Sequence, residues 1–136
     1  MSVEIFIARH GQNQDNAQGI LNGHRDMPLT DLGKEQAREL GEAIKSAALQ
    51  FDAVYSSPLA RAFETAEIIS QVAGTPRPLV YDQLIERDFG VLTGEPADKI
   101  EELCQPDIIK TDTITYFLSP EGAETFPQLV ERGSEY

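Results

Sequence analysis

Residues 5–8 form a short apolar run that ends abruptly in Arg9, His10 and Gly11. A run of this length that stops at a turn residue is typical of a buried strand. In an open parallel sheet, ligands bind just past the carboxyl ends of the strands, so Arg9 and His10 are expected at an edge where a site can form. A guanidinium grips phosphate oxygens and a neutral imidazole nitrogen can attack phosphorus, so this pair favours phosphoryl chemistry. The same residues also occur at ordinary strand ends. The rest of the chain distinguishes a phosphoryl-transfer site from such a strand end.

The length and composition favour one soluble domain over residues 1–136. Hydrophobic residues make up 40% of the chain and charged residues 25%, which is ordinary for a globular protein. A single cysteine, Cys104, excludes an intramolecular disulfide and is interpreted as a core thiol. The first strand begins almost at once and carries Glu4, so we expect no signal peptide, no membrane association and a cytoplasmic protein.

The negative charge is concentrated in the second part of the chain. The net charge is -12, and residues 82–136 carry four Lys and Arg against thirteen Asp and Glu. Nucleic acid is therefore not expected as a partner, because binding a phosphate backbone needs a basic face. A small anionic substrate is compatible with this charge only where arginines converge locally.

Two strand-to-helix passages follow the first strand and its polar loop at residues 12–27. Thr30 is expected to cap a helix over residues 31–48, and a second strand is expected at residues 51–56. Ser57 is then the expected cap of a helix that runs to residue 73. Arg61 falls in the first turn of that helix, where free backbone N–H groups make an anion site.

The remaining chain predicts a third strand and two more helices. A strand at residues 79–81 completes an alternation of strands and helices, which predicts an α/β fold with a parallel sheet. A helix is expected near residues 96–104, and a last one from Thr125 with Phe126, Leu129 and Val130 facing inward. Residues 106–120 are ambiguous, because the β-branched run at residues 113–117 is strand-like but is bracketed by prolines.

The ordered set of residues resembles the histidine phosphatase superfamily, in the branch that includes cofactor-dependent phosphoglycerate mutase. The resemblance implies a three-layer α/β/α fold with a mostly parallel central sheet. It rests on five segments in the family's order: Arg9-His10-Gly11 with Asn16; Gly23, Asp26, Pro28, Leu29, Thr30, Gly33 and Ala37; Ser57, Arg61, Ala62, Glu64, Thr65 and Ala66; Glu86, Gly90 and Gly94; and Gly122, Glu124 and Arg132.

The chain departs from the family's pattern in two places. Asn13 stands where the family usually has Thr or Ser, and its amide is expected still to donate to phosphate. The family's second catalytic histidine lies on a later strand, whereas this sequence ends at Tyr136. The other histidine, His24, does not match the motif and is interpreted as a solvated histidine at the rim of the site.

The second departure predicts a sheet whose C-terminal strands are missing from this chain. In the resembled fold the absent strand lies between the first two strands, so we expect a gap in the middle of the sheet. The gap is filled by residues beyond this sequence, by a segment such as residues 114–117, or by a second copy of the chain in a homodimer. The remaining alternative is that residues 1–136 alone fold poorly. We expect the sequence to be the N-terminal portion of a longer enzyme.

The resemblance implies a metal-independent phosphomonoesterase that acts on a small phosphorylated metabolite through a phosphohistidine. His10 is the expected nucleophile and Glu86 the proton donor, with Arg9 and Arg61 as catalytic phosphate clamps. Asn13, Asn16 and Gly23 are expected to add phosphate contacts. No cofactor or metal is expected, since no cluster of potential ligands has metal-site spacing. Phosphoglycerate mutase-type transfer and a non-catalytic phosphate-binding module are the alternatives.

Overall fold

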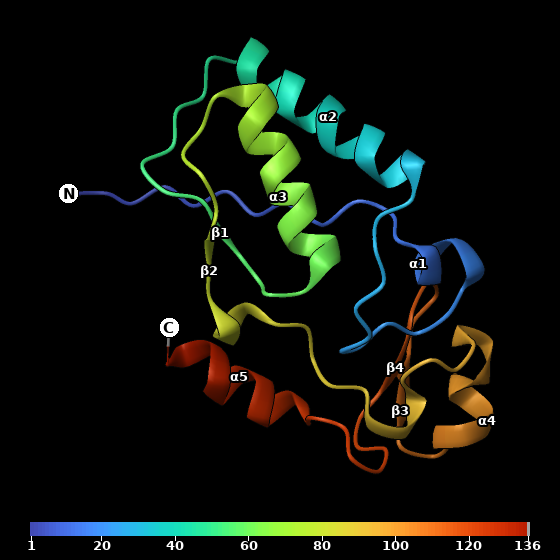
Figure 1. Cartoon of the computed structure of the whole chain (residues 1–136). Helices are drawn as coiled ribbons and strands as arrows, with labels where there is room; N and C mark the ends of the chain where they lie inside the picture. The colour runs from blue at the N-terminus through green and yellow to red at the C-terminus, as the bar shows by residue number, and fades with distance from the viewer. Residues whose placement is uncertain (136) are drawn as a thin grey trace.

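Two long helices, α2 (Asp31–Ser46) and α3 (Ala60–Ala73), pack against each other in the computed structural model, which describes residues 1–135. Figure 1 shows them together at one end of the molecule. The Thr30 side chain accepts a hydrogen bond from the backbone N–H of Gly33, so the predicted cap of α2 is confirmed. The helix ends two residues earlier than expected.

The start of α3 differs from the prediction. The helix begins at Ala60 with Leu59 as its N-cap, although Ser57 Oγ accepts from the Leu59 N–H at 3.3 Å. The Ala60 N–H donates to Asp26 Oδ1 at 2.6 Å, so a carboxylate of the chain itself occupies the first donor of this helix. Arg61 lies in the first turn, as predicted.

The described residues form two small sheets of two strands each. Strand β1 (Tyr55–Ser56) pairs in parallel with β2 (Leu79–Val80), with Tyr55 opposite Leu79, and α3 connects them. This confirms one parallel strand–helix–strand unit. Strand β3 (Ile108–Lys110) pairs antiparallel with β4 (Thr115–Phe117), so the ambiguous stretch contains a hairpin.

The predicted first strand over residues 5–8 is wrong for this structure. The segment has no ladder partner among the described residues, and Ile7 is 94% exposed. The expected three-layer central sheet is thus not formed, because an apolar run becomes a strand only where a neighbour takes its N–H and C=O groups. Residues 114–117 do not fill the gap, since β4 pairs with β3.

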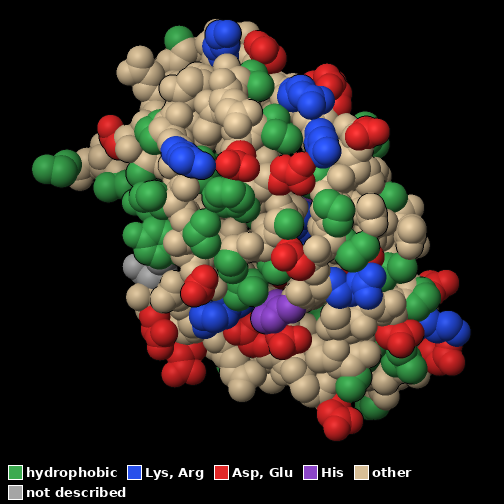
Figure 2. All heavy atoms as spheres, viewed as in Figure 1, with side chains coloured by type: hydrophobic (Ala, Val, Ile, Leu, Met, Phe, Trp, Pro, Cys, Tyr) green, Lys and Arg blue, Asp and Glu red, His purple; other side chains and the backbone are tan. Residues whose placement is uncertain are grey.

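A hydrophobic surface lies beside this unpaired region. Figure 2 shows apolar side chains gathered on the side of the molecule where the N-terminal segment and the β1–β2 pair lie. The exposed large hydrophobic side chains of these segments include Met1, Val3, Ile5, Phe6, Ile7, Leu79 and Val80.

A cluster of buried hydrophobic residues lies in the other half of the molecule, between the hairpin and α4 (Ile100–Cys104). It is formed by Leu92, Ile100, Cys104 and Phe117. Three short 3₁₀ turns lead into it: η1 (Asp82–Leu84), η2 (Gly90–Leu92) and η3 (Ala97–Lys99). Cys104 is a core thiol as predicted, and burial raises its pKa.

The last helix, α5 (Phe126–Ser134), begins as predicted. The Thr125 side chain accepts from the Gln128 N–H, and the Gln128 side chain accepts in return from the Thr125 N–H. Phe126 and Leu129 are partly buried, but Val130 is exposed, so its predicted inward orientation is wrong. None of the helices in the described part of the chain is both long and apolar enough to cross a bilayer.

The turn after His10 is pressed against the first turn of α2. A Cβ atom on Gly11 would lie 2.3 Å from the Gly33 carbonyl oxygen, and one on Gly33 would lie 2.0 Å from the Gln12 carbonyl oxygen. Both contacts are with backbone, which cannot swing away as a flexible side chain can. The two glycines therefore let the His10 turn reach the helix layer.

This packing predicts opposite effects of the same substitution at two helical glycines. Gly33→Ala should lower the free energy of unfolding by about 1–3 kcal/mol, because the added methyl group overlaps backbone. Gly133→Ala, in α5, has nothing within 4 Å and should be neutral or stabilising by up to about 1 kcal/mol. Urea unfolding of both variants measures the difference; equal stabilities would contradict the close approach.

Candidate active site

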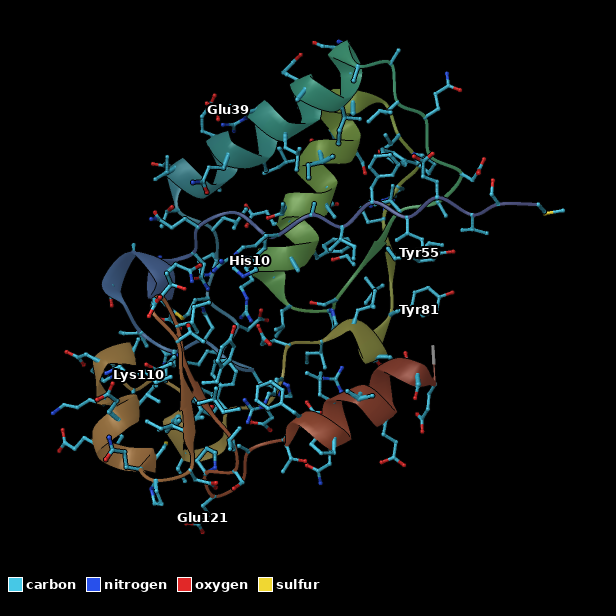
Figure 3. The ribbon with its side chains drawn as sticks, turned by 180° about the vertical axis from the view of Figure 1, so that it is seen from behind. His10, Glu39, Tyr55, Tyr81, Lys110 and Glu121 are labelled. Atoms are coloured by element: carbon cyan, nitrogen blue, oxygen red, sulfur yellow. The ribbon has the colours of Figure 1, made fainter. Side chains whose placement is uncertain are left out.

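A cavity of about 290 Å³ brings together five of the residues that the sequence singled out. Arg9 and His10 come from the N-terminal segment, Arg61 from the first turn of α3, and Glu86 from the segment between η1 and η2. Asn16, on α1 (Gln14–Gln18), also lines it. Figure 3 shows His10 in the middle of the molecule, near the N-terminal end of α3.

His10 is held in one tautomer by its own turn. Its Nδ1 lies 2.7 Å from the Gly11 carbonyl oxygen, and because a carbonyl only accepts, Nδ1 carries the proton. The lone pair is then on Nε2. Burial has the largest effect and lowers the pKa of His10 below its ordinary value of 6.5. The Gly11 hydrogen bond has the next largest effect and raises the pKa, the charges of Arg61 and Arg9 lower it, and Glu86 raises it least. The ring is therefore neutral at pH 7.

Arg61 is 2% exposed and is aimed by two backbone carbonyls. Its Nη1 donates to the Arg25 carbonyl at 2.9 Å and its Nη2 to the Gly23 carbonyl at 3.0 Å. A guanidinium has five N–H groups, so these bonds leave donors for a ligand. Gly23 does not line the cavity, and its carbonyl helps to hold Arg61 in place.

Thr65 joins the His10 turn to Arg61. Its Oγ1 accepts from the Gly11 N–H at 3.0 Å and donates to the Arg61 carbonyl at 2.6 Å, one turn earlier in α3. The side chain is buried. The sequence places Thr65 in a motif of the family but does not indicate what it does, because only the fold brings it next to Gly11.

The structure gives Asn13 a different task from the predicted phosphate contact. Asn13 and Asn16 form the capping box of α1, with each side-chain oxygen accepting from the other's backbone N–H. The Asn13 amide nitrogen donates to Asn22 Oδ1 at 2.6 Å, and the residue is 0% exposed. Asn13 is therefore used within the protein. The amide nitrogen of Asn16 is the group that can donate into the cavity.

Glu86 reaches the cavity from an exposed position. Its Oε1 accepts from the Arg87 N–H at 2.7 Å, which fixes one carboxylate oxygen. His24 Nε2 donates to the Glu86 carbonyl at 2.7 Å, and His24 Nδ1 lies 3.7 Å from Asp88 Oδ2. His24 is thus at the rim, as expected, and does not line the cavity.

The described residues contain no group of three or more His, Cys, Asp or Glu side chains placed to hold a metal ion. The cations of the cavity are the two arginines.

Comparison with known proteins identifies the family of this chain. The profile of the histidine phosphatase superfamily (branch 1) matches residues 5–136, and the chain belongs to that family. The chain is 35% identical over 134 residues to a 2,3-bisphosphoglycerate-dependent phosphoglycerate mutase of Parvibaculum lavamentivorans. The match covers 97% of this chain and 64% of the mutase.

Two solved structures of phosphatases are also similar. A mycobacterial glucosyl-3-phosphoglycerate phosphatase superposes with a TM-score of 0.72 at 25% identity, over 90% of this chain and 57% of that one. A phosphoserine phosphatase of Entamoeba histolytica, determined with 3-phosphoglyceric acid, gives a TM-score of 0.58 at 34% identity, over 68% and 44%. The chain spans less than two thirds of the length of these relatives.

The Thr65 contact predicts how His10 titrates. Thr65→Val keeps the shape but leaves the Gly11 N–H without its acceptor, so the turn should loosen and His10 should become more hydrated. Its pKa should then rise toward 6.5, and stability should fall by about 1–3 kcal/mol. The chain has two histidines, so NMR can follow each ring separately.

Thr65→Ser is the matched control, because it keeps the hydroxyl. It should leave the His10 pKa near the wild-type value. If Thr65→Val loses stability while the His10 pKa is unchanged, Thr65 supports the fold without positioning the histidine.

The same pKa predicts a dependence of stability on pH. Because the folded state holds the His10 pKa below that of the unfolded chain, the unfolded chain binds more protons between these two values. Stability should therefore be full above 6.5 and decrease as the pH falls toward the folded pKa. His10→Ala should remove this part of the decrease in thermal unfolding measured across pH 5–7, and an unchanged slope would contradict it.

Proposed function

We propose that the protein is a metal-independent phosphomonoesterase that acts on a small phosphorylated metabolite through a phosphohistidine. The observation that carries this proposal is the state of His10. A hydrogen bond at Nδ1 and a lowered pKa leave Nε2 unprotonated in a cavity that also contains two guanidinium groups. A neutral nucleophile beside anion-binding donors is what phosphoryl transfer requires.

The first half of the reaction forms a bond to His10. Nε2 attacks phosphorus while the bond to the ester oxygen breaks, and Glu86 gives its proton to that leaving oxygen. Arg9 and Arg61 bind the nonbridging oxygens, and Asn16 adds a neutral donor. The alcohol leaves, and the phosphoryl group remains on His10.

The second half returns the enzyme to its starting state. The Glu86 carboxylate takes a proton from water as the water oxygen attacks phosphorus, and the bond between phosphorus and Nε2 breaks. Inorganic phosphate leaves, His10 is neutral again and Glu86 is protonated for the next cycle.

Two observations keep other functions in view. The 35% identity to a phosphoglycerate mutase favours return of the phosphoryl group to a substrate in place of transfer to water. The chain's other histidine, His24, contacts the Glu86 backbone and is not in the cavity wall, which favours a phosphate-binding module with little turnover. Glucosyl-3-phosphoglycerate phosphatase and phosphoserine phosphatase among the relatives support hydrolysis.

Trapping of the intermediate tests the proposal. The chain is incubated with radiolabelled phenyl phosphate and quenched in alkali, and label that is stable to base and labile to acid is measured. We expect this label on the wild type and none on His10→Ala. That variant should keep nearly the wild-type fold, because the residue lines a cavity.

His24→Ala is the matched control, since it removes the other histidine and should keep the label. Equal labelling of His10→Ala would refute the assigned nucleophile. Binding of phenylphosphonate without labelling of the wild type would favour the binding module over the enzyme.

A further inference from the structure

Most of the cavity wall that does not hold the phosphate-binding groups is apolar. Besides the polar cluster, the lining consists of Gly19, Ile20, Leu21, Asn22, Phe89 and Ala97. None of these residues carries a charge. In the proposed reaction Arg9, Arg61 and His10 bind the phosphate group. This wall therefore faces the leaving group of the substrate.

This wall is built into the fold. The Leu21 N–H donates to the Glu95 carbonyl at 2.9 Å and the Ala97 N–H donates to the Gly19 carbonyl at 2.8 Å, so two chain segments are joined there. The Phe89 ring packs edge-to-face on Phe117, with centroids 4.9 Å apart, and so continues the buried core. These hydrogen bonds and this packing fix the wall before any ligand binds, so it is preorganised to contact an apolar group.

Two arginines near the cavity, Arg25 and Arg132, are paired with carboxylates of the protein. Arg25 makes a bidentate pair with the buried Asp15, at 2.7 Å and 3.1 Å. Arg132 makes a bidentate pair with Glu124, with both contacts at 2.8 Å. Neither guanidinium lines the cavity.

Arg87 follows Glu86 directly but points into the protein. It is 5% exposed and donates to the carbonyls of Glu124, Phe117 and Leu118 at 2.6–2.9 Å. The rings of Phe117 and Phe126 lie against its guanidinium. These three bonds and the two rings hold Arg87 inside the protein, and it does not line the cavity.

The other cations lie elsewhere. All eleven Lys and Arg fall within residues 1–135, and Figure 3 shows Lys110 away from His10. Ion pairs join Lys34 to Glu64, Arg38 to Glu35, Lys99 to Glu102 and Lys110 to Glu101. Lys45 lines a separate cavity near the C-terminal ends of α2 and α3, and Arg77 is exposed beyond α3.

We propose that the site selects phosphate monoesters whose leaving group is uncharged and apolar next to the phosphate. Two guanidinium groups neutralise one phosphate dianion and leave no cation in the described wall for a second anionic group. A carboxylate or second phosphate would meet uncharged and mostly apolar side chains within a chain of net charge -12. This inference rests on the proposed function and argues against phosphoglycerates as substrates of this site.

A pair of substrates that differ by one carboxylate tests this selectivity. Benzyl phosphate and 4-carboxybenzyl phosphate have the same leaving atom, and their kcat/KM values are compared at low ionic strength. We expect kcat/KM to be higher for the uncharged ester by about tenfold or more. A factor of this size corresponds to the loss of one hydrogen bond to a charged group. Equal or reversed preference would overturn the inference.

A binding measurement separates this inference from the proposed chemistry. Benzylphosphonate and 4-carboxybenzylphosphonate cannot be hydrolysed, and the shift of the His10 NMR signal reports their binding. The uncharged phosphonate should bind about tenfold more tightly. If it does and neither ester is turned over, the selectivity stands and the catalytic proposal fails. If the two bind equally, or neither shifts His10, the selectivity is wrong.

A single added cation provides the sharpest variant. Ala97→Lys places an ammonium on the apolar wall and should reduce the preference toward unity by improving the binding of the carboxylated phosphonate. Ala17→Lys, at an exposed position of α1 that does not line the cavity, adds the same charge and should keep the tenfold preference. Equal effects of both variants would mean that net charge, and not the wall, sets the selectivity.

Discussion

The hydroxyl group of Thr65 is the contact on which the candidate site depends. It accepts from the N–H that follows His10 and donates to the carbonyl of Arg61, so the His10 turn and Arg61 are joined by one buried atom. The N-terminal segment has no strand partner among the described residues, and without such a tie His10 would have no fixed relation to α3. On the other side, Gly11 and Gly33 allow the turn to touch α2. The site is thus held by the helices.

The parts that sequence predicted well are those decided by neighbouring residues. Thr30 caps α2 as predicted, and the last helix begins at Thr125 as predicted, because the contacts of a helix cap span only three residues. Five of the residues that line the cavity were singled out from the sequence, because they belong to motifs, whereas the apolar lining residues were not. Asn13 was misread because its partner Asn22 is joined to it only by the folded loop. The prediction of a strand at residues 5–8 was wrong because a strand needs a hydrogen-bonding partner. The local sequence pattern does not show whether such a partner is present.

The arginines show how one residue type serves two purposes. Arg87 is bonded to three carbonyls and covered by two rings, whereas Arg61 spends two bonds on carbonyls and keeps other donors for the cavity. Burial lowers the pKa of both, with Glu86 opposing it in each case. Burying a guanidinium is costly unless its donors are satisfied. Arg61 lines the cavity and Arg87 does not, so the two arginines differ in where the fold places the guanidinium, which a count of arginines in a sequence cannot give.

The apolar side chains near the β1–β2 pair have a consequence for the behaviour of the protein in solution. A short strand pair beside exposed Val3, Ile5 and Ile7 is a surface on which copies can adhere, by strand addition or by burial of side chains. The net charge of -12 opposes this, because like-charged molecules repel over a Debye length of about 8 Å at 0.15 M salt. At 1 M salt that length is about 3 Å. The solubility of this chain thus depends on the balance between hydrophobic association and electrostatic repulsion. Added salt weakens the repulsion and so favours precipitation.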